Sequence, residues 1–161
     1  MKTLDLNLTI TVAESLEELS LSEQELIKEA IAATDNSYSR YSHFSVGAAI
    51  RLVSGRIVRG ANQENASYGM TMCAERSAIF AAQSWYPDES ITTLAIAARN
   101  ETGALCDDPI APCGACRQVI LEMEDRYKQP IRILLYGKKS IYIADTVKTI
   151  LPLTFTGDSM L

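Results

Sequence analysis

Three cysteines and a glutamate form the clearest chemical pattern in the sequence. Cys113 and Cys116 lie three residues apart, and Cys73 lies upstream, two residues before Glu75. At the start of a helix, residues three apart share one face, so two sulfurs at this spacing can bind one tetrahedral zinc ion. Cys73 is the natural third ligand, because the N-terminus of a helix stabilises a thiolate. Three protein ligands leave a fourth position for water, which is the arrangement of catalytic zinc.

The carboxylate of Glu75 is the expected proton carrier beside this metal. Zinc deaminases combine an upstream [HC]-x-E pattern with a downstream P-C-x-x-C pattern, in which the glutamate is an acid/base and not a ligand. Both patterns occur here in that order, as CAE at 73–75 and PCGAC at 112–116. Their combination is far more specific than a single C-x-x-C pair. We therefore expect one Zn²⁺ per chain, although the sequence does not distinguish zinc from iron.

A positive charge should lie near the three thiolates. Three thiolates on Zn²⁺ leave a net negative charge, which works against a low pKa of bound water. Arg76 follows Glu75 directly and is the side chain that we expect to offset this charge. The N-termini of the two helices that begin at Cys73 and Cys113 should add to it, by about 0.3–1 kcal/mol each when exposed.

Each of these residues also has a plainer interpretation. Cys106 could complete a closed four-cysteine zinc site, but Glu75 would then have no role, so we favour a free buried thiol. Cys113 and Cys116 could instead form a redox pair. His43, the single histidine, is expected to be a loop residue and not a ligand.

Length and charge restrict the kind of protein further. The chain has 161 residues, close to the roughly 150 typical of one domain. Hydrophobic residues make up 47% and charged residues 22%, as in soluble globular proteins. The net charge is −5, whereas a protein that grips a phosphate backbone needs a basic surface. A nucleic-acid polymer is therefore not an expected partner.

Nothing in the sequence indicates a membrane protein. No stretch approaches the roughly 18 consecutive apolar residues of a membrane span. The first residues lack the basic-then-apolar order of a signal peptide. We expect a cytoplasmic protein, in which the four cysteines stay reduced and are available for metal binding.

Hydrophobic periodicity predicts the elements that position these residues. Strict alternation over 4–12 indicates a half-buried strand, and the pair Ser22 and Glu25 has the spacing of a capping box. The expected helices are 23–34, 73–85, 113–124 and 146–151, and the expected strands are 4–12, 46–53, 56–62, 91–98, 131–136 and 141–144. This order predicts a single α/β domain over 1–161, a three-layer α/β/α arrangement with a mixed five-stranded sheet and an added N-terminal strand. Residues 1–20 would form an N-terminal extension and 22–155 the catalytic core.

Five segments of the chain resemble the cytidine deaminase family and occur in the family's order. They are YSHFSVGAA at 41–49, NQENASY at 62–68, CAERSA at 73–78, PCGACRQ at 112–118 and ILPLTF at 150–155. The resemblance covers about 22–155 and leaves the strand expected at 4–12 outside it. It implies a zinc-dependent enzyme of pyrimidine salvage, which hydrolyses cytidine and 2′-deoxycytidine to uridine and 2′-deoxyuridine with release of ammonia.

The resemblance also implies which residues contact the nucleoside. They are Phe44, Asn62, Glu64, Tyr68, Ala74 and Phe155. Asn62 and Glu64 are assigned to the sugar, and since they alternate at the end of a strand, both can point to one side. Phe44 corresponds to the aromatic that stacks on the base, and Phe155 to one supplied by a neighbouring chain. Shared sites of this kind imply a homotetramer.

Other interpretations stay open at this point. The chain could deaminate another aminated heterocycle, as blasticidin-type enzymes do, although the pair Asn62 and Glu64 favours a nucleoside sugar. It could also be a non-catalytic zinc-stabilised domain, or an editor of polynucleotides, which the acidic charge disfavours. Asn62 could equally cap a turn, and the strand at 4–12 is expected to be an edge or oligomer element. Residues 69–72 leave the preferred nucleoside open.

Overall fold

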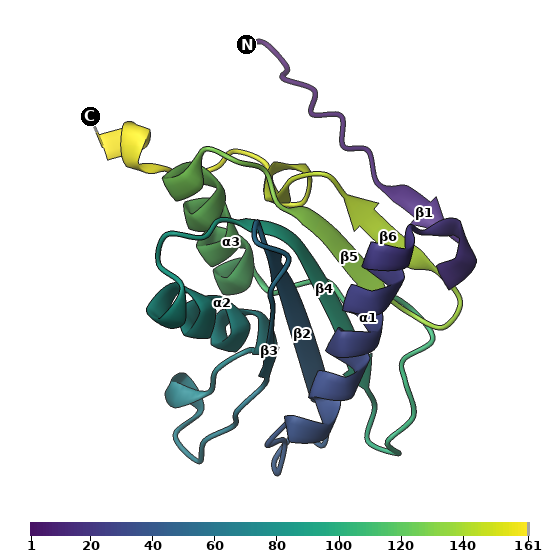
Figure 1. The fold of residues 1–161 in the computed structure, drawn as a ribbon. Helices are drawn as coiled ribbons and strands as arrows, with labels where there is room; N and C mark the ends of the chain where they lie inside the picture. The colour runs from purple at the N-terminus through teal and green to yellow at the C-terminus, as the bar shows by residue number, and fades with distance from the viewer. Residues whose placement is uncertain (161) are drawn as a thin grey trace.

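A six-stranded mixed sheet lies between two layers of helices in the computed structural model, which describes residues 1–160 (Figure 1). The strand order is β1-β6-β5-β4-β2-β3. Only β4 and β5 pair in parallel, and the other neighbours are antiparallel. The strands are β1 (Thr11–Ala13), β2 (Ser45–Leu52), β3 (Ile57–Ala61), β4 (Ile91–Arg99), β5 (Arg132–Tyr136) and β6 (Ile141–Ala144).

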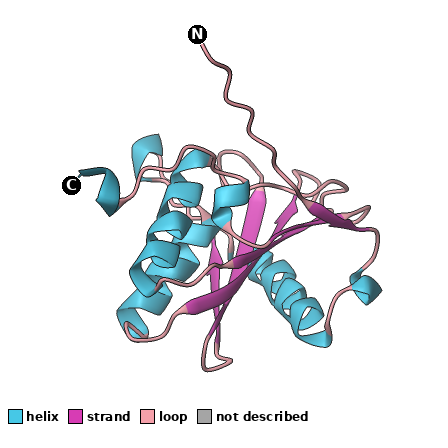
Figure 2. Cartoon of the chain, turned by 90° about the horizontal axis from the view of Figure 1, so that it is seen from above, coloured by secondary structure: helices cyan, strands magenta, loops and turns pink. Residues whose placement is uncertain are grey.

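The helices cover both faces of this sheet (Figure 2). Helix α1 (Leu21–Ala33) packs on one face, whereas α2 (Ala74–Trp85) and α3 (Gly114–Tyr127) pack on the other. Helix α3 supplies the crossover that the parallel pair β4 and β5 requires. The predicted three-layer α/β/α fold with five core strands is confirmed, with β1 as the added sixth strand. Within residues 1–160, no helix has both the length and the apolar character of a membrane span.

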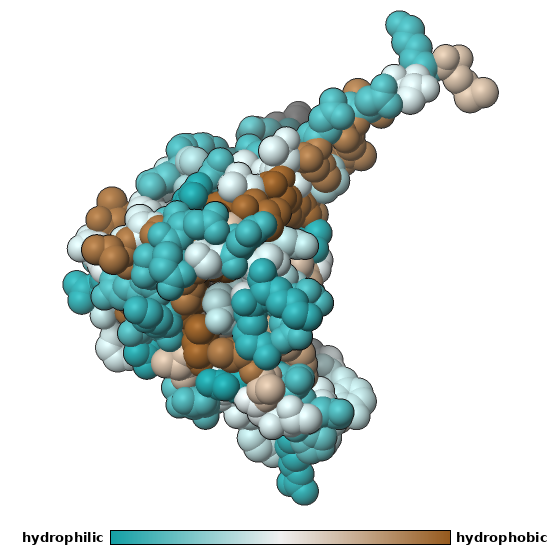
Figure 3. Space-filling model, turned by 90° about the vertical axis from the view of Figure 1, so that its right-hand side faces the viewer, coloured by the Kyte–Doolittle hydropathy of each residue, from teal (hydrophilic) through white to brown (hydrophobic). Residues whose placement is uncertain are grey.

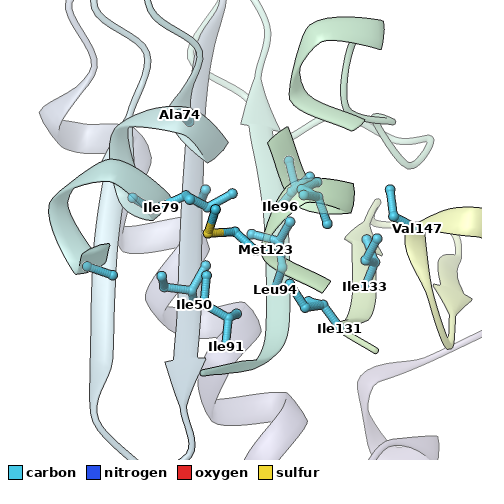
Figure 4. Packing of buried hydrophobic residues seen from close by; sticks show 14 of the residues in the cluster. Ile50, Ala74, Ile79, Ile91, Leu94, Ile96, Met123, Ile131, Ile133 and Val147 are labelled. Carbon is cyan, nitrogen blue, oxygen red and sulfur yellow. The ribbon is translucent and has the colours of Figure 1, made fainter. Parts of the chain in front are cut away.

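Strand alternation builds a separate core on each face. In β4, Leu94 and Ile96 point to the face of α2 and α3, while Ala95 and Ala97 point to the face of α1. Figure 4 shows the first core, in which Ile79 and Met123 extend from the two helices toward the sheet. Each fully buried aliphatic side chain contributes about 1.5–3 kcal/mol to folding, so both cores hold the helices firmly in place. Ala74, which directly follows the expected metal ligand Cys73, belongs to the first core.

The cap of α1 differs from the prediction. We expected Ser22 and Glu25 at the start of the helix, but α1 is capped by Ser20 and Glu23. The Glu23 carboxylate accepts from the backbone N–H of Ser20 at 3.0 Å, and it also accepts from Arg132 of β5 at 2.6 Å. Glu25 instead pairs with Arg51 of β2 at 2.7 Å. The serine and glutamate at 20 and 23 have the same spacing as those at 22 and 25. The two glutamates differ in the arginine of the sheet that each of them binds.

The N-terminal strand is much shorter than predicted. The prediction of a strand over 4–12 is wrong for residues 4–10, because the ladder with β6 covers only Thr11, Val12 and Ala13. Strand β6 ends at Ala144, and the residues that follow it lie near 7–9 but form no ladder with them. The predicted closing helix at 146–151 is also shorter, a 3-10 turn at Val147–Thr149. The other boundaries differ from the predictions by up to three residues.

Two glycines let helices approach the sheet closely. A Cβ atom on Gly47 of β2 would lie 2.1 Å from the carbonyl oxygen of Ala30 in α1. A Cβ atom on Gly60 of β3 would lie 2.5 Å from the carbonyl oxygen of Ala74 and 2.4 Å from the backbone nitrogen of Ala78, both in α2. Real side chains do not tolerate such contacts with backbone. The absence of a side chain at Gly60 therefore determines how near the first turn of α2 lies to the sheet.

Candidate metal centre and substrate cavity

The three cysteines expected to bind zinc lie together at the N-termini of two helices. Cys73 is the N-cap residue of α2 and Cys113 that of α3, and Cys116 lies buried in the first turn of α3. The Sγ atoms of Cys73 and Cys113 are 3.9 Å apart, and those of Cys113 and Cys116 are 3.4 Å apart. All three sulfurs lie within 4.8 Å of one another.

This donor set fits zinc. With Zn–S bonds near 2.3 Å, tetrahedral geometry requires sulfurs about 3.8 Å apart, close to the observed spacing. Soft thiolate ligands favour zinc over hard cations such as magnesium. Cys106 lies outside the cluster, which among residues 1–160 contains only these three cysteines. A site with three protein ligands therefore agrees with the donor set better than a closed four-cysteine site.

Arg76 supplies the positive charge expected near the thiolates. Its Nη2 atom lies 3.7 Å from the Sγ atom of Cys73. Its Nε atom is buried and has no hydrogen-bond partner within the described residues. Hydrogen bonding from Cys116, reinforced by Arg76, lowers the pKa of Cys73 to about 5. The thiolate form of Cys73, which is the form that binds a metal, is thus favoured at neutral pH.

Glu75 is a buried carboxyl group beside the cysteines. It lies in the first turn of α2, is only 4% exposed, and lines the same cavity as Cys73 and Cys113. Burial is the main cause that raises its pKa above the ordinary value for glutamate. A carboxyl group with a raised pKa can both accept and return a proton near neutral pH. Since Cys73 is the N-cap residue and not part of the regular helix, Cys73 and Glu75 can face the same cavity.

The cavity has a volume of about 200 Å³ and a mostly apolar wall. Its lining residues are Val46, Asn62, Thr71, Met72, Cys73, Ala74, Glu75, Ile96, Ile110, Ala111 and Cys113. A second hollow of about 320 Å³ is lined by Tyr41, Ser42, Glu64, Tyr68 and Thr71. Thr71 lines both, so the two hollows are neighbours. An apolar cavity with a few polar groups is typical of a site for a small molecule.

Asn62 lines the cavity but is largely engaged within the protein. Its Oδ1 atom accepts from the hydroxyl of Ser37 at 2.6 Å and from the backbone N–H of Val46 at 2.8 Å. Its Nδ2 atom donates to the carbonyl oxygen of Phe44 at 2.9 Å. One N–H group of the amide remains for a ligand. Asn62 therefore also fixes the loop that leads into β2.

Glu64 is held in place by the loop that contains Tyr41 and Ser42. Its carboxylate accepts from the backbone N–H of Tyr41 at 2.6 Å and from the hydroxyl of Ser42. The hydrogen bond from Ser42 is the main cause that lowers the pKa of Glu64. The carboxylate is thus ionised and fixed beside the second hollow, where it can accept further hydrogen bonds.

Not all of the residues implied to contact the nucleoside meet within one chain. Ala74 lines the cavity, and Tyr68 lines the second hollow while it stays 74% exposed. Phe44 is half-buried but does not line the cavity. Phe155 is 58% exposed and also lies outside it, with its carbonyl oxygen bound by the side chain of Gln118 at 2.9 Å. His43 lies exposed in a loop with a φ of 54°.

The structure adds cavity residues that the sequence did not identify, Ile110 and Ala111, and it places Thr71 and Met72, from the segment 69–72 that we expected to influence nucleoside preference, in the same lining. Met72 is positioned by a two-way backbone pair with Gln63, in which each N–H donates to the other's carbonyl at 2.9 Å. Ile110 and Ala111 directly precede the P-C-x-x-C pattern, and this position in the sequence could have indicated that they line the cavity. The pairing of Met72 with Gln63 gave no signal in the sequence, because it joins two loops through backbone groups alone.

Comparison with protein families identifies the domain. Residues 21–128 match the family described as cytidine and deoxycytidylate deaminase zinc-binding region. A cytidine deaminase of Halalkalibacterium halodurans is 42% identical over 137 residues, which cover 85% of this chain and 96% of the relative. A cytidine deaminase of Sporosarcina psychrophila is 38% identical over 137 residues, 85% of this chain and 93% of the relative.

Solved structures agree with this match. The crystal structure of cytidine deaminase from Burkholderia pseudomallei has a TM-score of 0.70 and 35% identity, and the alignment covers 81% of this chain and 97% of that one. The crystal structure of cytidine deaminase from Mycobacterium tuberculosis has a TM-score of 0.64 and 31% identity, with 85% and 99% covered. Residues 1–20 precede the region that the family description matches.

Proposed function

We propose that this chain, which belongs to the cytidine and deoxycytidylate deaminase zinc-binding family, hydrolyses cytidine and 2′-deoxycytidine to uridine and 2′-deoxyuridine with release of ammonia. The observation that carries the proposal is the position of a buried carboxyl group, Glu75, in the same cavity as a three-cysteine zinc site. A non-catalytic zinc domain would need neither the cavity nor the buried acid.

The metal is held by Cys73, Cys113 and Cys116, which would bind one zinc ion per chain. When bound, zinc supplies Lewis acidity that makes water a nucleophile near neutral pH. Arg76 and the N-termini of α2 and α3 offset the negative charge of the three thiolates. The net charge of the site then favours deprotonation of water.

Glu75 is the proposed acid and base of the reaction. It takes a proton from the attacking water and delivers it to the ring N3 atom while oxygen adds to C4. It then carries the proton of the hydroxyl added at C4 to the leaving amino group, so that the products are the 4-oxo pyrimidine and ammonia. Its raised pKa and its burial support this role, because a surface glutamate would stay ionised and hydrated.

The second hollow is the proposed site of the sugar. Glu64 in this hollow can accept hydrogen bonds from ribose hydroxyls, and the remaining N–H group of Asn62, which lines the neighbouring cavity, can donate one. Ala74 lines the space for the base. Phe44 is assigned to base stacking, and Tyr68 to the rim of the hollow. A pair of sugar-directed residues favours a nucleoside over a heterocycle without a sugar.

We further propose a homotetramer with shared sites. The exposure of Phe155 and Tyr68 supports it, since both aromatics would be covered by another subunit. Phe80 and Trp85 are also exposed on α2. The catalytic core is proposed to span 22–155, with 1–20 as an N-terminal extension. A reducing compartment, such as the cytoplasm, is proposed as the location because the metal ligands are thiolates.

The variant Glu75→Gln tests the proposed function. The parent should convert cytidine with a loss of its ultraviolet absorbance signal, whereas Glu75→Gln should lose at least about 10³-fold in kcat, because its amide cannot carry the proton. Both proteins should contain about one zinc per chain, since glutamine leaves the ligands unchanged. A folded, zinc-loaded parent that converts neither nucleoside would refute the assignment, and other aminated heterocycles would then be tested.

A further inference from the structure

The N-terminal arm, defined as residues 1–10, is not used by the proposed reaction. It leaves the body of the protein as an extended segment (Figure 1), and none of its residues belongs to a helix or strand. It also precedes the residues that match the deaminase family, which begin at 21. Its role must therefore be found in its own sequence and surroundings.

The arm has one apolar and one polar face. From residue 3 onward its even positions are Leu4, Leu6, Leu8 and Ile10, and its odd positions are Thr3, Asp5, Asn7 and Thr9. Leu4, Leu6 and Leu8 are 74%, 50% and 55% exposed. Hydrophobic colour follows one side of the arm and continues onto the body of the protein (Figure 3). Single exposed leucines are common, but three in strict alternation form a surface that is suited to burial.

This apolar face continues a face of the sheet. Ile10 packs against the core under α2 and α3, and the even residue that follows, Val12, lies on the same side of β1. Val12 is opposite Tyr142 of β6, and both are exposed. The row from Leu4 to Tyr142 thus extends one sheet surface, and apart from the half-buried Ile10 its side chains are exposed in the described chain.

The backbone of the arm is also open for pairing. Within residues 1–160, β1 pairs only with β6, so its other edge presents free N–H and C=O groups. An open edge that continues into an alternating segment can accept another strand. Leu8 lines a hollow together with Asp145 and Thr149, which follow β6, and the edge of β1 away from β6 has no partner strand in the described chain.

We propose that the arm is an intermolecular β-strand that pairs with the arm of a second copy of this chain. In an antiparallel pair centred on Asn7, Leu4 lies opposite Ile10 of the partner subunit, and Leu6 lies opposite Leu8 of the partner subunit. Both apolar rows then face the same side. In a two-fold symmetric dimer both copies contribute the same surface, so the arm needs to be complementary only to itself.

Charge and sheet continuity favour a second copy as the occupant. The side chains of the arm include one lysine, Lys2, and one aspartate, Asp5, so two arms do not repel each other through a net charge. An isolated two-stranded ribbon is marginal in water. Here each strand continues into a six-stranded sheet, so the pair would join two sheets at their β1 edges.

A pair of matched triple variants tests the proposal. Leu4→Ser, Leu6→Ser and Leu8→Ser together remove the apolar face, while Asp5→Ser, Asn7→Ser and Thr9→Ser together change only the polar face. Hydrogen exchange measures protection of the amides of residues 4–10 at high protein concentration. Sedimentation velocity over a dilution series measures the dissociation constant of the assembly. Neither measurement uses turnover, so the result is independent of the proposed deaminase activity.

We expect protected arm amides in the parent and in the polar-face variant. The apolar-face variant should lose this protection, and its assembly should dissociate at a concentration about tenfold higher or more. Rapid, unprotected exchange of residues 4–10 in the concentrated parent would overturn the proposal. Protection that survives in the apolar-face variant with an unchanged dissociation constant would overturn it as well.

Discussion

The helix on one face of the sheet begins differently from the two helices on the other. The start of α1 is satisfied locally, because Ser20 and Glu23 form a capping box and Glu23 also binds Arg132. Helices α2 and α3 begin at Cys73 and Cys113, and neither cysteine makes a side-chain cap. Their first N–H groups and their helix dipoles therefore lie at the thiolates.

This difference separates a scaffold from a site. Replacing a good cap costs roughly 0.5–2 kcal/mol, so two uncapped helix starts are a cost in stability. The cysteine sulfurs are instead free to bind a metal, and the metal ties α2 to α3. The face of α1 contains no such cluster in the described chain. Changes on the two faces should consequently have different consequences.

The largest effect is expected from removal of a metal ligand. Cys116→Ala should abolish zinc binding and reduce kcat/KM by more than the 10–100-fold that changes outside the ligand set cost. The matched change on the other face, Ser20→Ala, should lower the free energy of unfolding by about 1 kcal/mol and leave the zinc content unchanged. Metal analysis and urea unfolding measure both. Equal zinc content in the two variants would contradict the conclusion that the starts of α2 and α3 bind the metal while the start of α1 only supports the fold.

The two close-packed glycines should give the next largest effect. Gly47→Ala and Gly60→Ala each place a methyl group against helix backbone, so each should lower the free energy of unfolding by about 1–3 kcal/mol or more. Only Gly60→Ala should also weaken zinc binding, because Ala74, which it displaces, lies between Cys73 and Glu75. Competition with a chelator measures the affinity. An equal loss of zinc affinity in both variants would show that the faces are coupled.

The smallest effect should be the acid sensitivity of the α1 cap. Partial burial raises the pKa of Glu23, but hydrogen bonds from Ser20 and Arg132 outweigh it and hold the pKa below its ordinary value. A carboxyl group whose pKa is lower in the folded state stabilises the protein above the unfolded value, about 4.3, and this contribution is lost as the pH falls through the folded pKa.

The difference in free energy of unfolding between the parent and Glu23→Gln should therefore become smaller as the pH falls from 6 to 3. Urea unfolding of both proteins at each pH measures this gap, and any loss of metal in acid affects both alike. A gap that stays constant over this range would mean that the ionised form of Glu23 does not stabilise α1.

Local spacing was enough to predict much of this protein. Helix and strand types follow from periodicity, because a side chain's face depends only on its place along the element. The pairing of CAE with PCGAC predicted the cysteine cluster and the acid beside it, since each motif lies within one helix turn. The roles of Glu75, Asn62 and Glu64 in the reaction stay predictions.

Only the tertiary structure decided between locally equivalent choices. Ser20 caps α1 in place of Ser22 because Arg132, from a distant strand, binds Glu23. The N-terminal alternation forms a strand only as far as β6 extends beside it, which leaves residues 4–10 unpaired within the chain. Alternation determines which side chains share a face, but a strand also needs a partner for its backbone. That partner comes from elsewhere in the chain or, as proposed here, from a second copy.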